Sequence, residues 1–440
     1  MATNGDIKTS KQTMVASKRR CWLIVIGGFM IMATCYTIFV NCLPLFQSAV
    51  VGDLGITIAN YNTANSLSTV VAVFASLLIG KLLDNHSARI LGAASVITCG
   101  LALFAFAAVN SLWQLYAICF IVGFAVLSGT RLLVSVLITN WFQAKRGLAI
   151  SIALSGSGVG AIILMPICSA LIQGPGWRMA LVVMGIVCLT CSLPLTIAVF
   201  ANHPSDVGLE MFGAGALEEE IPQTVPDNTS DVDLGWQVVR KSPAFWLLII
   251  GFVMMGVCNG AIIVNNNTVF TGVQLGDTYV TLGGHDATWA ANVLAFMMFV
   301  VIIGKVSLGA VYDKLGLNAG TLLGAITTML ALVCLFFPQT DWGPILQAVF
   351  FGFGTCLGTV APPIMAVKEY GQKDIGMITG VITAFEMFGV AIGAVVSGVM
   401  FDATLSFNST WVFCLVCTVI MLIALNASVP LSRKLVDSHR

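Results

Sequence analysis

Three charged residues, Arg131, Lys305 and Glu386, stand inside long runs of apolar residues. At a rise of about 1.5 Å per residue in a helix, each lies roughly 12 to 15 Å from the polar end of its run, which is about mid-depth in a bilayer. A charge at that depth is disfavoured by about 2.5 to 3.5 kcal/mol, so such residues normally face an aqueous cavity or one another. A guanidinium or ammonium group can bind an anion, and a carboxyl group can bind a cation or carry a proton.

The composition indicates that these charges belong to a membrane protein. Of the 440 residues, 58% are hydrophobic and 9% are charged, whereas soluble domains are about 25% charged. The formal net charge is zero, so no basic surface favours nucleic acid as a partner. The 13 Cys residues show no CxxC or Cys/His spacing, and we interpret them as small hydrophobic residues rather than metal ligands or disulfides. We expect no metal and no cofactor.

Apolar runs of about twenty residues, which is long enough to cross a bilayer, occur along the whole chain. Six fall at 22–46, 61–83, 89–109, 113–139, 147–173 and 177–201, and six more at 244–270, 286–311, 319–338, 344–367, 376–401 and 410–428. Residues 203–242 between them are acidic and contain Pro, which is typical of a flexible linker. We predict an all-α membrane protein with a tail at 1–21, a six-helix half at 22–201, a linker at 202–243, a six-helix half at 244–428 and a tail at 429–440.

The orientation follows from Lys and Arg in the predicted loops. Nearly all of these residues fall on the side of the two termini, and Arg178 falls on the other side. Cytoplasmic loops carry the excess of basic residues, so we predict that both tails and the linker are cytoplasmic and that the protein is a multi-pass protein of the cell membrane.

A short motif repeats after the second run of each half. GKLLDNHSAR begins at Gly80 and GAVYDKLGLN begins at Gly309, and each places a Gly for close helix approach before an Asp at a helix end. Two six-helix halves with such G-x-x-x-D loops resemble the major facilitator superfamily, and the resemblance covers nearly the whole chain. It implies two pseudo-symmetric halves and a gating role for the residues of these loops: Gly80, Asp84, Arg89, Gly309 and Asp313.

Two further segments resemble the branch of oxalate–formate antiporters and monocarboxylate transporters. These are NWFQAKRGLAISIALSGSGVGA at 140–161 and KSPAFWLLIIGF at 241–252. The resemblance implies a carrier of small organic anions that works by alternating access. It also implies that Lys305 is the basic residue of the eighth span and neutralises a substrate carboxylate. From its place in the fourth span, Arg131 of the other half can grip a carboxylate with two parallel hydrogen bonds. The oxalate–formate exchangers have a second cation in the eleventh span, where this chain has Glu386, and this difference argues against a dianionic substrate.

The leading hypothesis is therefore a secondary carrier of a small organic anion. The three mid-depth charges sum to about one positive charge, which suits a monocarboxylate. Glu386 is the only acid that we place inside a predicted span, and we expect it to carry a proton in symport, although anion exchange needs no such step. The expected partners of the monomer are the carboxylate, a proton or counter-anion, and the bilayer. No nucleophile with a base and no phosphate-binding loop indicates an enzyme.

Other interpretations stay open at this point. Lys305 can extend its ammonium group toward the interface, Arg131 can bridge helices, and Glu386 can form a structural ion pair with Lys305. Tyr36 and Asn259 can bind substrate or a neighbouring helix equally well. A carrier of a zwitterion or an amine, with Glu386 on the ammonium group, a dicarboxylate antiporter, and a membrane receptor of the same fold are the alternative functions.

Overall fold

The structure is a computed structural model that describes residues 19–85, 87–142, 146–209, 211–212, 234–275, 278–371 and 374–437. Within these ranges, the side chains of residues 76–85, 127–129, 146–147 and 313 are not described. Most of the predicted tail at 1–21 and of the linker at 202–243 lies outside the described residues, as does the end of the predicted tail at 429–440.

The first part of the chain forms helices that contain π-helical turns. The first apolar run includes the π-helical segments η1 (Met32–Tyr36) and η2 (Ile38–Cys42) and continues as α2 (Leu43–Leu54). The following elements are α3 (Ile58–Asn85), α4 (Ala88–Ala107), α5 (Leu112–Ile121), η3 (Val122–Leu127), α6 (Ser128–Trp141), α7 (Arg146–Gln173), α8 (Trp177–Val199) and the 3₁₀ turn η4 (Pro204–Val207).

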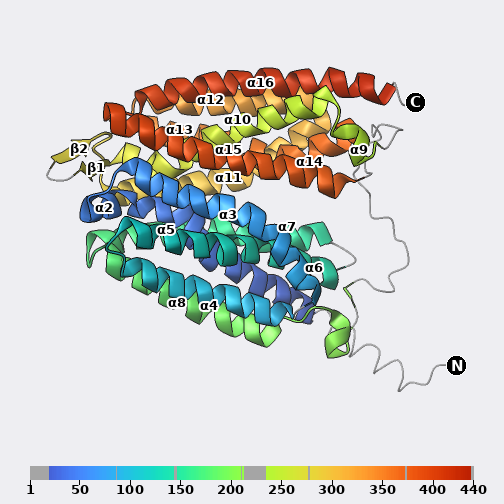
Figure 1. Cartoon of the computed structure of the whole chain (residues 1–440), viewed down its shortest axis with the longest axis horizontal. Coiled ribbons are helices and arrows are strands. Elements are labelled where there is room, and N and C mark those ends of the chain that lie inside the picture. Colours follow the sequence, from blue (N-terminus) through green and yellow to red (C-terminus); the bar gives the residue numbers. More distant parts are fainter. Residues whose placement is uncertain are drawn as a thin grey trace. The chain divides into compact units, whose positions relative to one another are not determined.

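The second part has the same helical character (Figure 1). It comprises α9 (Trp236–Val239), α10 (Pro243–Phe270), α11 (Ala287–Leu315), α12 (Leu317–Cys334), α13 (Trp342–Gly354), α14 (Cys356–Tyr370), α15 (Ile375–Thr404) and α16 (Asn408–Asp437). Its helix starts follow local chemistry, because Ser242 accepts a hydrogen bond from the backbone of Ala244, and Asp286 accepts two at the start of α11. Helix α16 extends to Asp437, well beyond the end of the predicted run at 428.

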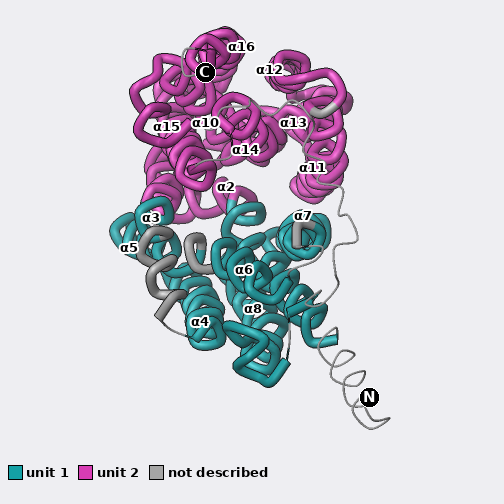
Figure 2. Tube along the Cα trace, turned by 90° about the vertical axis from the view of Figure 1, so that its right-hand side faces the viewer, with its two compact units in different colours: residues 1–43, 71–221 teal, residues 44–70, 222–440 magenta. Residues whose placement is uncertain are grey.

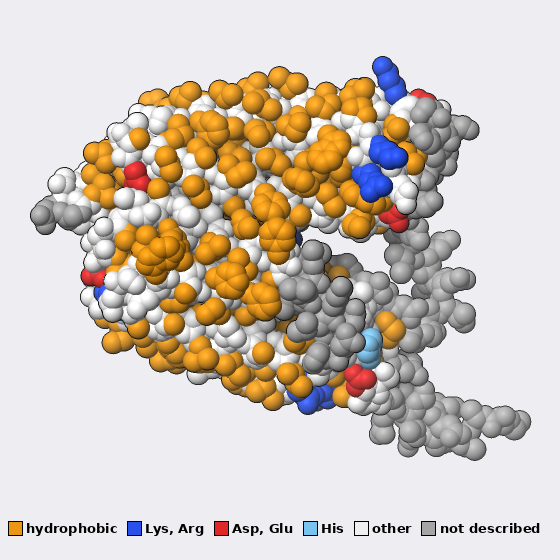
Figure 3. Space-filling view, in the orientation of Figure 1, with side chains coloured by type: hydrophobic (Ala, Val, Ile, Leu, Met, Phe, Trp, Pro, Cys, Tyr) orange, Lys and Arg blue, Asp and Glu red, His pale blue; other side chains and the backbone are white. Residues whose placement is uncertain are grey.

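The predicted all-α membrane fold is confirmed. In the described residues, 11 helical segments are long and apolar enough to cross a membrane. The predicted run at 61–83 coincides with α3, whose first half is rich in Asn and Ser and therefore less hydropathic. Hydrophobic side chains are spread over much of the surface drawn in Figure 3, as expected for helices in contact with lipid.

A β-hairpin between α10 and α11 was not predicted. Strand β1 (Gly272–Leu275) pairs antiparallel with β2 (Thr278–Thr281) in the register Gly272 to Thr281. The two strands are short, and their alternating pattern in VQL and TYV is too brief to stand out beside long apolar helices.

The chain divides into two compact units, which Figure 2 shows in different colours. Unit 1 contains residues Met1–Leu43 and Val71–Ile221, and unit 2 contains Pro44–Val70 and Pro222–Arg440. Unit 2 thus includes α2 and the first half of α3, which precede most of unit 1 in the sequence. Hydrogen bonds explain this: both carboxylate oxygens of Asp402 on α15 accept from the backbone at Ile58 and Ala59, where α3 begins. The predicted halves at 22–201 and 244–428 follow the sequence repeat and stay a prediction.

Candidate functional site

Helices α10 and α15 contact each other through glycines on both sides. A Cβ at Gly256 or Gly260 of α10 would clash with the backbone of α15, and a Cβ at Gly389 or Gly393 of α15 would clash with the backbone of α10. Glycines four residues apart lie on one helix face and allow two backbones to approach closely. The two helices accordingly lie side by side (Figure 1), and polar side chains next to the glycines are brought together.

The carboxyl group of Glu386 on α15 and the carboxamide of Asn259 on α10 converge on Gly358 of α14. A Cβ at Gly358 would clash with Oε1 of Glu386 and would lie 3.3 Å from Nδ2 of Asn259. Glu386 is 8% exposed and Asn259 is 5% exposed. Within the described part of the chain, Oδ1 of Asn259 has no hydrogen-bond partner. Three helices therefore bring a proton-binding group and an unused acceptor to one point. Sequence reasoning selected Glu386 and Asn259 but gave no signal for Gly358.

Lys305 lies on α11 with an exposed side chain. The residue before it, Gly304, packs against the end of α13 and the start of α14, because a Cβ there would lie 2.9 Å from the carbonyl oxygen of Gly352 and 2.9 Å from Sγ of Cys356. Cys356 precedes Gly358 by two residues on the same helix. The turn of α11 that holds Lys305 is thus packed against the helix on which Glu386 and Asn259 converge.

Arg131 and Tyr36 lie in unit 1. Arg131 is on α6 with an exposed side chain, and its carbonyl oxygen accepts a hydrogen bond of 3.0 Å from Ser135. Tyr36 ends the π-helical segment η1 and is partly buried. Their roles in substrate binding stay a prediction.

The two repeated loop motifs are only partly described. The side chains of Asp84 and Asp313, and the surroundings of Gly80, lie outside the described residues. Arg89 donates from Nε to the carbonyl oxygen of Phe200 at 3.0 Å, which ties α4 to the end of α8.

Gly309 differs from the expectation of close helix approach. A Cβ at this position would meet no atom within 4 Å of the described structure. Close packing therefore does not require a glycine at 309 in this conformation, and the gating role of the motif stays a prediction.

A second buried acid, Glu369, lies near the end of α14 and was missed. Its Oε1 accepts a hydrogen bond of 3.1 Å from Ser428 on α16, and the side chain is almost fully buried. The predicted run ended at 367, whereas the apolar helical segment continues to Tyr370. Glu386 is therefore not the only acid inside a membrane-spanning segment.

The C-terminal part of α10 carries a polar network that the sequence analysis also missed. Asn265 accepts hydrogen bonds from Gln47 of α2 and Asn62 of α3 and donates to Ser397 of α15. Thr268 adds a bond to Oε1 of Gln47, and every member is buried. All of these residues belong to unit 2. The network fastens α2 and α3 to α10 and α15.

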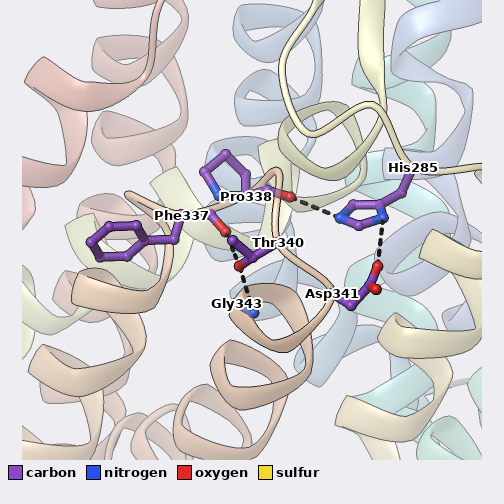
Figure 4. A network of polar contacts seen from close by, with 6 residues as sticks. All are labelled: His285, Phe337, Pro338, Thr340, Asp341 and Gly343. Atoms are coloured by element: carbon purple, nitrogen blue, oxygen red, sulfur yellow. Dashed lines mark hydrogen bonds and ion pairs between the residues drawn. The ribbon is translucent and has the colours of Figure 1, made fainter.

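Figure 4 shows a further polar network at the start of α11 and α13. Nε2 of His285 lies 2.9 Å from the carbonyl oxygen of Pro338, and Nδ1 lies 3.8 Å from Oδ1 of Asp341. The imidazole stacks on Trp289 with ring centroids 4.1 Å apart. These contacts connect the loop before α11 with the loop before α13. They do not involve Glu386, Asn259 or Gly358.

Comparison with known proteins identifies the family. Residues 24–369 match the family model of the Major Facilitator Superfamily. The chain is 24% identical over 398 residues to the MFS-type transporter pynF of Aspergillus niger, covering 87% of this chain and 82% of that protein. It is 22% identical over 417 residues to Monocarboxylate transporter 12 of Rattus norvegicus, covering 89% of this chain and 82% of that protein.

A solved structure supports the fold. The crystal structure of the nucleoside transporter NupG superposes with a TM-score of 0.70 at 15% sequence identity, covering 93% of this chain and 98% of that one. At this identity the likeness concerns the fold alone. With the family model covering most of its length, the chain belongs to the Major Facilitator Superfamily and is a membrane transporter rather than an enzyme.

Proposed function

We propose that this transporter is a proton-coupled carrier of a small monocarboxylate that works by alternating access in the cell membrane, with both termini in the cytoplasm. The observation that carries the proposal is that the buried carboxyl group of Glu386 and the carboxamide of Asn259 converge at Gly358. Oδ1 of that carboxamide has no hydrogen-bond partner among the described residues. The name of Monocarboxylate transporter 12, a relative over most of the chain, supports the substrate class.

Lys305 would bind the substrate carboxylate as a point charge, because an ammonium group lacks the bidentate geometry of a guanidinium. Uncompensated charge is costly at mid-membrane depth. In this proposal Lys305 is the countercharge of Glu386 in the empty carrier, and Glu386 takes up a proton when the substrate occupies Lys305, so the loaded site stays close to neutral. Arg131 and Tyr36 remain further predicted ligands of the substrate.

Oδ1 of Asn259 adds a preference among monocarboxylates. A buried acceptor without a donor is unfavourable, and a hydrogen bond to it contributes about 0.5 to 1.5 kcal/mol. A substrate that carries a hydroxyl group beside its carboxylate would supply that donor. A 2-hydroxy monocarboxylate should therefore be preferred over an unsubstituted one by roughly 3- to 10-fold.

A zwitterion carrier is the second candidate, because Glu386 and Oδ1 of Asn259 are both acceptors and suit an ammonium group. Propionate, lactate and alanine separate the candidates, since they differ only in the hydrogen, hydroxyl or ammonium group at carbon 2. Uptake into proteoliposomes with an inward proton gradient should be highest for lactate, lower for propionate and absent for alanine. Alanine transport alone would establish the zwitterion carrier, and uptake of none of the three above protein-free liposomes would contradict both candidates.

Asn259→Leu provides the matched variant. It should retain propionate uptake and lose the preference for lactate, because Leu offers no acceptor to the hydroxyl group. An unchanged ratio of lactate to propionate uptake would remove Asn259 from the substrate site.

A further inference from the structure

Three cysteines that are far apart in the sequence meet in the interior of unit 1. Cys35 lies in η1, Cys99 in α4 and Cys188 in α8. Sγ of Cys188 lies 3.1 Å from Sγ of Cys35 and 3.3 Å from Sγ of Cys99, and all three sulfur atoms lie within 4.8 Å of one another. All three side chains are fully buried. No motif in the sequence indicated this cluster.

The helix that holds Cys35 is irregular at this position. Residues Met32–Tyr36 form a π-helical segment, and π-helical turns inside α-helices are frequent at functional sites. The hydroxyl group of Thr34 lies 2.6 Å from Oγ of Ser192 on α8 and 3.7 Å from Sγ of Cys35. Hydroxyl groups thus hold η1 and α8 together beside the sulfur atoms.

The cysteines of unit 2 offer a contrast. Sγ of Cys258 donates to the carbonyl oxygen of Cys414 at 3.3 Å and lies 3.4 Å from the hydroxyl group of Thr418. A buried thiol that bonds a carbonyl or hydroxyl oxygen behaves as a small hydrophobic residue with a weak donor. In unit 1 three thiols from three helices meet, and they are the one group of three such ligand atoms among the described residues.

We propose that Cys35, Cys99 and Cys188 form a binding site for a soft monovalent metal ion, Cu(I). Thiolate sulfur selects soft metals such as Cu(I). At a metal–sulfur distance of about 2.3 Å, three sulfur atoms around one ion would lie about 4 Å apart. That spacing falls inside the 4.8 Å limit of the cluster and requires only a small outward movement of the side chains.

Charge balance favours a monovalent ion. One thiol releases its proton as one Cu(I) binds, so the site is neutral before and after binding. This matters because a net charge buried among apolar helices is energetically unfavourable. The other two sulfur atoms complete the coordination as neutral donors. A divalent ion such as Zn²⁺ would require two deprotonated thiols and a fourth ligand. The site would link three helices of unit 1, and its metal binding can be measured without any transport assay.

Anaerobic titration of the reduced, purified protein with Cu(I) against a chromophoric Cu(I) chelator tests the proposal. The wild type should retain one tightly bound ion in competition with the chelator, and Cys35→Ala/Cys99→Ala/Cys188→Ala should retain none, because it lacks all three sulfur ligands. Cys258→Ala/Cys414→Ala/Cys417→Ala removes the same number of buried cysteines from unit 2 and should bind Cu(I) like the wild type. X-ray absorption at the copper edge should show sulfur neighbours only.

Thermal unfolding keeps the test informative if the triple variant of unit 1 is unstable. Cu(I) should raise the melting temperature of the wild type and of the unit 2 variant, and should raise it less in the single variant Cys99→Ala. Equal stoichiometry and affinity in both triple variants would overturn the proposal. A Cys35–Cys188 disulfide in the protein purified without reductant, seen as a mass two hydrogen atoms lower and accompanied by no Cu(I) binding after reduction, would also overturn it.

Discussion

Helix α10 carries two buried polar groups that differ in how completely they are hydrogen-bonded. Asn265 uses both its carboxamide atoms, with Oδ1 accepting from Gln47 and Asn62 and Nδ2 donating to Ala261 and Ser397. Asn259, almost two turns earlier, leaves Oδ1 without a partner. A satisfied network stabilises one arrangement of helices, whereas an unsatisfied acceptor beside a carboxyl group is available to a ligand. Burial alone does not distinguish the two residues, but hydrogen bonding does.

The largest expected effect concerns Glu386 in comparison with the other buried acid, Glu369. Glu386→Gln resembles the protonated form permanently, so it should abolish substrate accumulation driven by a proton gradient while leaving exchange of internal for external substrate intact. Wild-type uptake should rise as the external pH falls, because the carboxyl group is then loaded with a proton from that side. The measurement is uptake into proteoliposomes at several external pH values.

Glu369→Gln is the matched control, because it removes an acid of similar burial that bonds Ser428 rather than converging on Gly358. It should accumulate substrate like the wild type. Glu386 would not be the proton-binding residue if Glu386→Gln still accumulated substrate, or if only Glu369→Gln failed to accumulate it.

Lys305 should show the next largest effect. Lys305→Ala should lose uptake, and Lys305→Arg should retain part of it, because the charge is needed while a guanidinium has a different geometry. Substrate binding to the purified, monodisperse variants measures this directly. Binding by the alanine variant with wild-type affinity would instead support the interpretation that Lys305 extends toward the interface.

Stability should separate the two asparagines of α10. Asn265→Leu leaves Gln47, Asn62 and Ser397 with unmatched groups and should lower the free energy of unfolding by about 2 kcal/mol. Asn259→Leu removes an unpartnered oxygen and should change stability by less than about 1 kcal/mol. Thermal unfolding in one detergent compares the variants. Equal destabilisation would mean that both asparagines are structural.

The sequence predicted the helices well because a membrane requires each backbone group to be bonded within its own helix, so long apolar runs leave few alternatives. The convergence of Glu386, Asn259 and Gly358 depends on how each helix is rotated about its axis. Each of these helices is apolar on all its faces, so the pattern of apolar residues in the sequence carries little information about the rotation. The same reason hid the meeting of Cys35 with the cysteines of α4 and α8. Glycine pairs such as Gly256 and Gly260 are the best signal for helix contact, but they do not name the partner helix.

The smallest expected effects compare two glycines of unit 2 that differ in their surroundings. A Cβ at Gly358 would clash with Oε1 of Glu386 and approach Nδ2 of Asn259, so Gly358→Ala must displace both groups. The KM for the substrate should rise several-fold, with little change in the amount of folded protein.

A Cβ at Gly309 meets no atom within 4 Å. The transport rate of Gly309→Ala should therefore stay within about twofold of the wild-type rate, and the helix should gain up to about 1 kcal/mol in stability. If Gly309→Ala reduces transport strongly while remaining folded, another conformation of the transport cycle brings a helix against this glycine, and the gating role predicted for the motif is supported. If Gly358→Ala transports with an unchanged KM, the carboxyl group and the carboxamide do not meet the substrate at this point on α14.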